Sequence, residues 1–71
     1  MSAEIIAALI AAGYRIENMT EVWGHGWWDE TPYRWMKGEG STLDFGEPCA
    51  TEAEAWADAM LDDEHHAKRA A

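Results

Sequence analysis

Apolar residues recur along the first twelve positions with the period of an α-helix. The apolar residues that share one helical stripe are Ile5, Ile6, Leu9 and Ile10. Ser2 precedes this stripe as a suitable N-cap, and Gly13 follows its last position. The pattern therefore predicts a helix over residues 2–12.

Two later stretches alternate instead with the period of a β-strand. In YRIENM, residues 14–19, we expect Tyr14 and Ile16 to face the core. In YRWMK, residues 33–37, Trp35 occupies the corresponding inward position. Both stretches are expected to pair within one sheet.

A glycine-rich segment, GEG, predicts a hairpin loop over residues 38–40. The following STLDF, residues 41–45, is expected to return as a third strand with Leu43 and Phe45 facing in.

The segment TEVWGHGWW leaves two alternatives open, either one bulged strand or a loop that leads into the second strand. We favour strand character at Trp27 and Trp28, with Pro32 at an edge or a break.

A second helix is predicted over residues 51–66. Thr51 and Glu54 have the spacing of a capping box. The apolar residues that recur behind it at helical spacing are Ala53, Trp56, Ala57, Met60 and Leu61. His65 and His66 would lie at the helix C-terminus, where positive charge complements the helix dipole.

These elements predict one α+β domain over residues 1–71 with the order α-β-β-β-α. Its sheet is a three-stranded antiparallel meander, and both helices pack on one face because each needs to bury its apolar stripe. Seventy-one residues with a single cysteine have no internal disulfide to stabilise them. Most of the five tryptophans are therefore expected in the core, with Trp35 and Trp56 the clearest cases.

The charge is strongly acidic, with 14 acidic against 5 basic residues and a net charge of −9. Residues 38–67 contain no lysine or arginine. Such a surface repels nucleic acid and anionic membranes and attracts basic surfaces. Solubility alone is the alternative explanation.

Candidate chemistry is sparse. Glu47 and Glu52 flank Cys49 and would raise the pKa of its thiol, so a nucleophilic role is disfavoured. Adjacent His65 and His66 point about 100° apart on a helix and lack the spacing of a metal-binding pair. His25 lies between two glycines, which leave its ring unfixed. We expect no enzyme activity, no metal and no cofactor.

The N-terminus lacks the basic start of a signal peptide, and its apolar run is shorter than the about 20 residues that span a bilayer. We therefore expect no membrane association and a cytoplasmic location.

The consecutive Trp27 and Trp28 indicate a surface for a partner. Adjacent strand residues point to opposite faces, so one of the two is expected to face outward. An exposed tryptophan beside Asp29, Glu30 and Arg34 has the composition of an interface hot spot. The alternative is that a flanking loop covers it.

The layout resembles small acidic proteins encoded by phages and prophages. The stretches that carry the resemblance are AEIIAALIAAGYRIE, WW, YRWMKGEG and TLDFGEPCATEAEAWADAM. The resemblance extends to the anti-CRISPR inhibitors, which lack catalytic residues, and it implies an inhibitor that binds a host nucleic-acid-binding complex, in some cases as a DNA mimic. No residue role carries over from that class.

The leading hypothesis is thus a monomeric inhibitor that binds the basic surface of a host nucleic-acid-binding protein in the host cytoplasm, without contacting nucleic acid itself. The helix is expected to turn its carboxylates outward, and an exposed tryptophan supplies the apolar anchor. The residues expected to contact the partner are Glu52, Glu54, Asp58, Asp62, Asp63, Glu64, Trp27, Trp28, Asp29 and Glu30. The alternative is a non-catalytic interaction module, or a homodimer paired through its aromatic face, whose acidity serves solubility.

Overall fold

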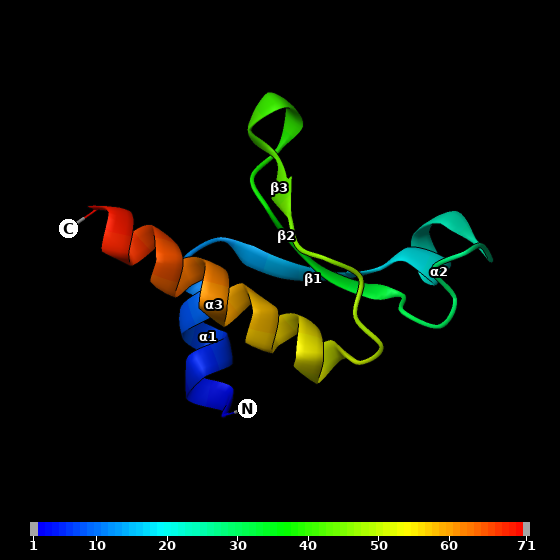
Figure 1. The fold of residues 1–71 in the computed structure, drawn as a ribbon, viewed down its shortest axis with the longest axis horizontal. Helices are drawn as coiled ribbons and strands as arrows, with labels where there is room; N and C mark the ends of the chain where they lie inside the picture. Colours follow the sequence, from blue (N-terminus) through cyan, green and yellow to red (C-terminus); the bar gives the residue numbers. More distant parts are fainter. Residues whose placement is uncertain (1, 71) are drawn as a thin grey trace.

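A three-stranded antiparallel sheet in the order β1-β2-β3 forms the centre of the fold, and helices stand at both ends of the chain (Figure 1). The structure is a computed structural model that describes residues 2–70, with the side chains of residues 2–66. The elements, in chain order, are α1 (Ala3–Ala11), β1 (Tyr14–Asn18), α2 (Met19–Trp23), β2 (Tyr33–Lys37), the 3₁₀ turn η1 (Gly40–Thr42), β3 (Asp44–Phe45) and α3 (Glu52–Ala70). The predicted α+β class and the three-stranded antiparallel meander between two terminal helices are confirmed, and α2 is an additional short helix that was not predicted.

Helix α1 is set by its ends, as predicted. The Ser2 side chain accepts a hydrogen bond from the Ile5 backbone N–H at 3.3 Å, which satisfies one of the unpaired donors of the first turn. The chain then enters β1 directly after Gly13. This short connection places α1 against the first strand.

The register of the sheet determines which side chains meet the helices. β1 and β2 pair along their full length, with Ile16 opposite Trp35. Side chains alternate between the two faces of a strand, so Tyr14, Ile16 and Trp35 share one face. That face is the one predicted from the alternation.

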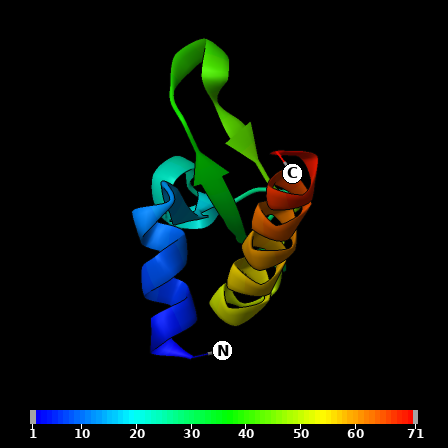
Figure 2. The same cartoon turned by 90° about the vertical axis from the view of Figure 1, so that its left-hand side faces the viewer.

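The core lies between this face and the two helices. Its buried members are Leu9, Tyr14, Trp35, Trp56 and Ala59. Figure 2 shows α1 in blue and α3 in yellow to red. Helix α1 supplies Leu9, and α3 supplies Trp56 and Ala59. Both helices therefore pack on the same face of the sheet, but from the predicted stripe of α1 only Leu9 is buried and Ile6 partly buried, whereas Ile5 and Ile10 are exposed. The predicted core positions of Trp35 and Trp56 are confirmed. The expectation that most of the five tryptophans lie in the core was wrong, because the other three lie between β1 and β2, outside it.

Two buried aromatic side chains donate hydrogen bonds to carboxylates of α3. The Trp35 indole N–H donates to Asp58 Oδ2 at 2.8 Å, and the Tyr14 hydroxyl donates to Asp62 Oδ2 at 2.6 Å. The two rings also contact each other edge to face, with centroids 5.3 Å apart. A buried N–H or O–H without a partner is costly, so these bonds determine which side of α3 faces the sheet.

Gly46 permits the close approach of the chain after β3 to this cluster. A Cβ atom at this position would overlap the Trp35 indole nitrogen and come within 2.6 Å of Asp58 Oδ2. The Gly46 backbone N–H donates to the Trp35 carbonyl at 3.0 Å, which holds the chain there. Any larger residue would displace the indole from its acceptor.

The predicted apolar face of α3 was wrong by about one residue of rotation. Ala53 and Leu61 are exposed, whereas Ala55 and Ala59 are fully buried. The hydrogen bonds from Tyr14 and Trp35 turn the Asp58 side of the helix toward the sheet, and the apolar stripe shifts with it. The Thr51 hydroxyl accepts from the Glu54 backbone N–H at 3.1 Å, so the predicted N-cap is confirmed.

The C-terminal extent of α3 also differs from the prediction. Its backbone is helical to Ala70, beyond the predicted end at residue 66. His65 and His66 therefore lie inside the helix and do not cap it.

The third strand is shorter than predicted and presents the opposite face. Only Asp44 and Phe45 pair with β2, and Phe45 lies opposite Met36. Met36 is on the face away from the helices, so Phe45 is too, and its side chain is 54% exposed. Leu43, expected to face in, is exposed as well.

The expected strand at Trp27 and Trp28 was also wrong. The Asn18 side chain accepts from the Glu21 backbone N–H at 3.2 Å and starts helix α2 where the strand would have continued. Residues 26–31 then form turns closed by hydrogen bonds from Asp29 N–H to Gly26 O and from Thr31 N–H to Trp28 O.

The stability of this core is expected to fall in alkaline solution. Burial and the hydrogen bond to Asp62 raise the pKa of Tyr14 above its ordinary value of 10.0. The folded protein then holds this proton more tightly than the unfolded chain does. The free energy of unfolding should therefore keep the Tyr14 contribution below pH 10 and lose it as the pH rises above about 10. Urea unfolding between pH 8 and 11 measures this.

The control is the Tyr14→Phe variant, which keeps an aromatic face under the Lys37 ammonium, 4.7 Å from the Tyr14 ring. It should be less stable at pH 8 and should lose less stability on going to pH 11. Parallel pH curves for the two proteins would contradict the role given to the Tyr14 hydroxyl.

Candidate protein-binding surface

The connection between β1 and β2 forms a separate lobe at one end of the molecule (Figure 1). We call residues 19–32 the tryptophan lobe, since they hold three of the five tryptophans. Its base is closed by a hydrogen bond of 2.8 Å from the Met19 backbone N–H to the Pro32 carbonyl, and the Met19 side chain is buried beneath it.

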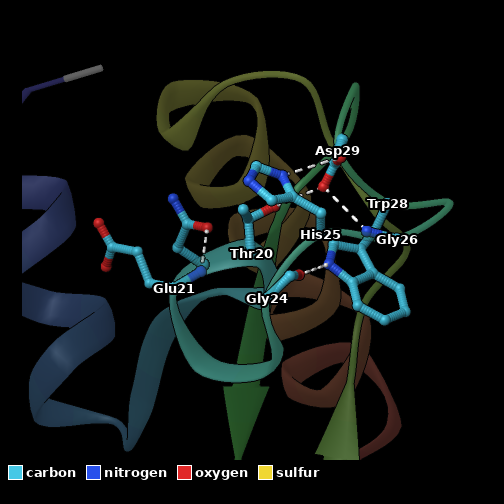
Figure 3. Close-up of polar contacts among 8 residues, drawn as sticks. Thr20, Glu21, Gly24, His25, Gly26, Trp28 and Asp29 are labelled. Carbon is cyan, nitrogen blue, oxygen red and sulfur yellow. Dashed lines mark hydrogen bonds and ion pairs between the residues drawn. The ribbon is translucent and has the colours of Figure 1, made fainter.

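Asp29 is the centre of the hydrogen bonds inside the tryptophan lobe (Figure 3). Its Oδ1 accepts from the Thr20 hydroxyl at 3.2 Å and from the Gly26 backbone N–H at 3.1 Å. Its Oδ2 lies 3.1 Å from His25 Nδ1. The carboxylate thus joins the loop to helix α2 and also contacts His25, whose side chain is 89% exposed.

These contacts also favour the charged form of the carboxylate. The Gly26 backbone hydrogen bond lowers the pKa of Asp29, and the hydrogen bonds from His25 and Thr20 lower it further. Asp29 was expected to contact a partner directly. Its bonding inside the lobe indicates that it shapes the loop that carries the tryptophans.

Trp28 fills the inside of the lobe. Its indole N–H donates to the Gly24 carbonyl at 2.9 Å (Figure 3), and the side chain is half-buried. A Cβ atom on Gly26 would lie 2.7 Å from the Trp28 ring, so only glycine leaves room for it there. Trp28 is therefore a support for the other two tryptophans of the lobe.

The exposed rings form one continuous row. We define the aromatic row, from the sheet outward, as Phe45, Arg34, Trp23, Trp28 and Trp27. Trp28 contacts Trp23 on one side and Trp27 on the other, each with ring centroids 5.5 Å apart and planes at 77°. Trp27 is 74% exposed and Trp23 is 54% exposed. The prediction that one ring of the pair at 27 and 28 faces outward is confirmed, although by a turn and not by strand alternation.

Arg34 joins the sheet end of the row to the lobe. Its guanidinium carbon lies 5.0 Å from the Trp23 ring centroid and 4.8 Å from that of Phe45. Its Nε also donates to Glu17 Oε2 at 2.9 Å, and both side chains are largely buried. The charge of Arg34 is thereby neutralised within the protein, and its plane acts as a spacer between two rings.

The six predicted acids of α3 do not form one surface. At about 100° of rotation per residue their side chains are distributed around the helix circumference. Asp58 and Asp62 were expected to face outward, and this was wrong, because they accept hydrogen bonds from Trp35 and Tyr14 on the sheet side. Asp63 is half-buried, whereas Glu54 and Glu64 are exposed on other sides.

Glu52 lies apart from these acids, next to the tryptophan lobe. It lines a pocket of about 260 Å³ together with Glu21, Asn18, Tyr33 and Ile16. Two carboxylates at one pocket are suited to the ammonium or guanidinium group of a partner side chain. The remaining predicted residue, Glu30, is exposed on the loop after Asp29.

Cys49 is a half-buried free thiol on the chain before α3. Burial raises the pKa of this thiol, and the nearby carboxylates of Asp58, Glu54 and Glu47 raise it further. The thiol is therefore protonated at neutral pH, which agrees with the prediction that it is unsuited to nucleophilic chemistry.

Sequence reasoning missed Trp23, Phe45 and the spacer role of Arg34. Asn18 followed by Glu21 is a helix-start spacing, and it could have indicated α2 and the position of Trp23. Nothing local in the sequence could have placed Phe45 beside them, because its position depends on the pairing of β3.

Within residues 2–70 no helix has both the length and the apolar character needed to cross a membrane. The chain matches no protein-family model, no curated protein and no solved structure.

Replacing Asp29 with alanine should loosen the tryptophan lobe while leaving the core folded. The variant loses the three hydrogen-bond contacts that hold the loop, so the Gly26 amide hydrogen should exchange with solvent about tenfold faster or more. Hydrogen exchange followed by NMR measures this at each amide.

Glu30→Ala is the matched control, since it removes the same charge from the neighbouring exposed position. It should leave lobe exchange near that of the unsubstituted protein. Equal protection of Gly26 in the Asp29→Ala variant would contradict the organising role of Asp29.

Proposed function

We propose that the protein is a non-catalytic binding protein that attaches to a basic protein surface through the aromatic row of its tryptophan lobe. The observation that carries this proposal is the exposure of Trp23, at the end of α2, and Trp27, in the following loop, in a lobe held by internal hydrogen bonds. Single exposed apolar residues are common, but contiguous exposed aromatic side chains are typical of binding sites. Tryptophan is also the residue type most enriched among interface hot spots.

The fixed conformation of the lobe favours binding energetically. Ordering a flexible loop on association costs free energy, and here Asp29 and Trp28 hold the loop before any partner arrives. Trp27 is held against Trp28, so little rotamer freedom is lost when it is covered.

The charge around the row indicates the chemistry of the partner. Residues 16–33 contain Glu17, Glu21, Asp29 and Glu30 and no lysine or arginine. Arg34 and Glu17 neutralise each other, which leaves Glu21, Asp29 and Glu30 as the acids of this region, and Arg15 donates to the Gly38 carbonyl. A basic surface complements this region, and the acidic pocket beside it suits a partner lysine or arginine.

The same charge argues against two other occupants. Nucleic acid is disfavoured because the acidic residues would repel its phosphate groups, although tryptophans can stack on bases. A second copy would bring two acidic lobes together, so we propose a monomer in its free state.

The narrower form of the proposal is an anti-CRISPR-type inhibitor that occupies a nucleic-acid-binding complex in the cytoplasm of a bacterial host. Nucleic-acid-binding proteins carry the basic surfaces that a protein of net charge −9 would meet. The inhibitor would act by covering such a surface. A DNA-mimicking helix is the less favoured version, because two of the α3 carboxylates are turned inward.

The Trp27→Ala variant should lose binding while remaining folded, because this side chain is mostly exposed. Truncation of a hot-spot tryptophan weakens binding by about 2 kcal/mol or more, roughly 30-fold. We would identify a partner by capture from nuclease-treated bacterial lysate and then measure its affinity by calorimetry between 50 and about 300 mM salt. Leu61→Ala, at an apolar position of α3 that is 60% exposed, is the control and should bind normally.

Charge reversals separate the lobe from the helix as the contact surface. Glu21→Lys with Glu30→Lys should weaken binding and flatten its salt dependence more than Glu54→Lys with Glu64→Lys. Larger effects from the helix pair would support the DNA-mimic version instead. Full binding by Trp27→Ala, or a dimeric mass in light scattering that Trp27→Ala abolishes, would contradict the proposal.

A further inference from the structure

Three metal-ligating side chains from β3 and α3 meet on the side of the molecule away from the tryptophan lobe. They are Asp44 of β3 and Asp62 and His66 of α3, and each offers a ligand atom within 4.8 Å of the other two. The side chains of Asp62 and His66, in the second half of α3, thus approach Asp44 of the β2–β3 hairpin. The cluster therefore joins two segments that lie about 20 residues apart in sequence.

The geometry of the helical pair suits a shared ion. Asp62 and His66 are four residues apart, a spacing that places both side chains on one face of a helix. Asp62 Oδ2 and His66 Nε2 are 3.5 Å apart. Two ligands of one ion at about 2.0–2.2 Å are separated by roughly 3–3.5 Å in tetrahedral or octahedral geometry. A shift of Asp44 toward this pair would complete three ligands.

The Asp62 carboxylate is held in place from the core side. The Tyr14 hydroxyl, on a side chain that is 1% exposed, donates to Asp62 Oδ2 at 2.6 Å. Hydrogen bonds of this kind orient metal-ligating carboxylates and are a regular part of metal sites. One ligand is thus positioned before an ion binds.

Local charge also favours a cation. Asp44 and Asp62 bring two carboxylates together in a protein that is already strongly acidic. The Lys37 ammonium lies over the Tyr14 ring. Within the side chains of residues 2–66 it makes no ion pair with Asp44, Asp62 or His66. A divalent ion would remove the repulsion between the two carboxylates.

We propose that Asp44, Asp62 and His66 bind a divalent transition-metal ion of the zinc type. One imidazole with two carboxylates favours Zn²⁺ or Co²⁺ over Ca²⁺ and Mg²⁺, which prefer oxygen ligands alone. This site was not predicted from the sequence, because His66 was considered there only as a pair with its neighbour His65. The ion would tie the β2–β3 hairpin to α3, where only two residues of β3 pair with β2. The proposal stands independently of the proposed binding function.

The test is titration of the tag-free, chelator-treated protein with Zn²⁺ by calorimetry and with Co²⁺ by visible absorption. We expect one ion per chain and a rise in the thermal unfolding midpoint with added Zn²⁺. His66→Ala should weaken binding by more than about tenfold, and Asp44→Asn should weaken it as well. Both substitutions are at exposed positions, so both variants should fold.

His65→Ala is the matched control. His65 is exposed and its ring centroid is 6.3 Å from that of His66, but it is outside the cluster. The His65→Ala variant should bind Zn²⁺ as the unsubstituted protein does and give the same Co²⁺ spectrum. Absence of binding, equal binding by His66→Ala, or equal losses in the two histidine variants would overturn the proposal.

Discussion

Two buried aromatic side chains need hydrogen-bond acceptors, and this need sets the arrangement of the whole protein. Tyr14 and Trp35 provide much of the core of this small chain, and each carries one polar hydrogen into it. Asp58 and Asp62 of α3 accept these hydrogens. Burying the rings without such partners would cost much of the free energy that burial gains. The orientation of α3 follows from this requirement.

This arrangement divides the aromatic residues into two groups with different tasks. Trp35 and Trp56 close the core, whereas Trp23, Trp27 and Trp28 lie in a lobe outside it. The lobe has its own internal hydrogen bonds and reaches the sheet through Arg34. A chain of 71 residues can thus expose large rings without weakening its core. Two carboxylates of α3 are correspondingly less available to an outside partner.

Local pattern in the sequence was sufficient for the parts of the fold that depend on local rules. The helical period and Ser2 defined α1, strand alternation identified β1 and β2, and Thr51 marked the start of α3. Rotation of α3 could not be predicted, because it depends on hydrogen bonds that link residues 23 and 48 positions apart. The candidate surface was found only in part for the same reason, since Phe45 joins it through strand pairing.

A double-mutant cycle on Trp35 and Asp58 tests this account most directly. The free energy of unfolding in urea would be measured for the unsubstituted protein, Trp35→Phe, Asp58→Ala and the double variant. If the indole hydrogen bond orients α3, the two substitutions should be coupled by about 1–2 kcal/mol, because either one removes the same interaction. Additive effects, equal within about 0.5 kcal/mol to the sum of the single changes, would contradict it.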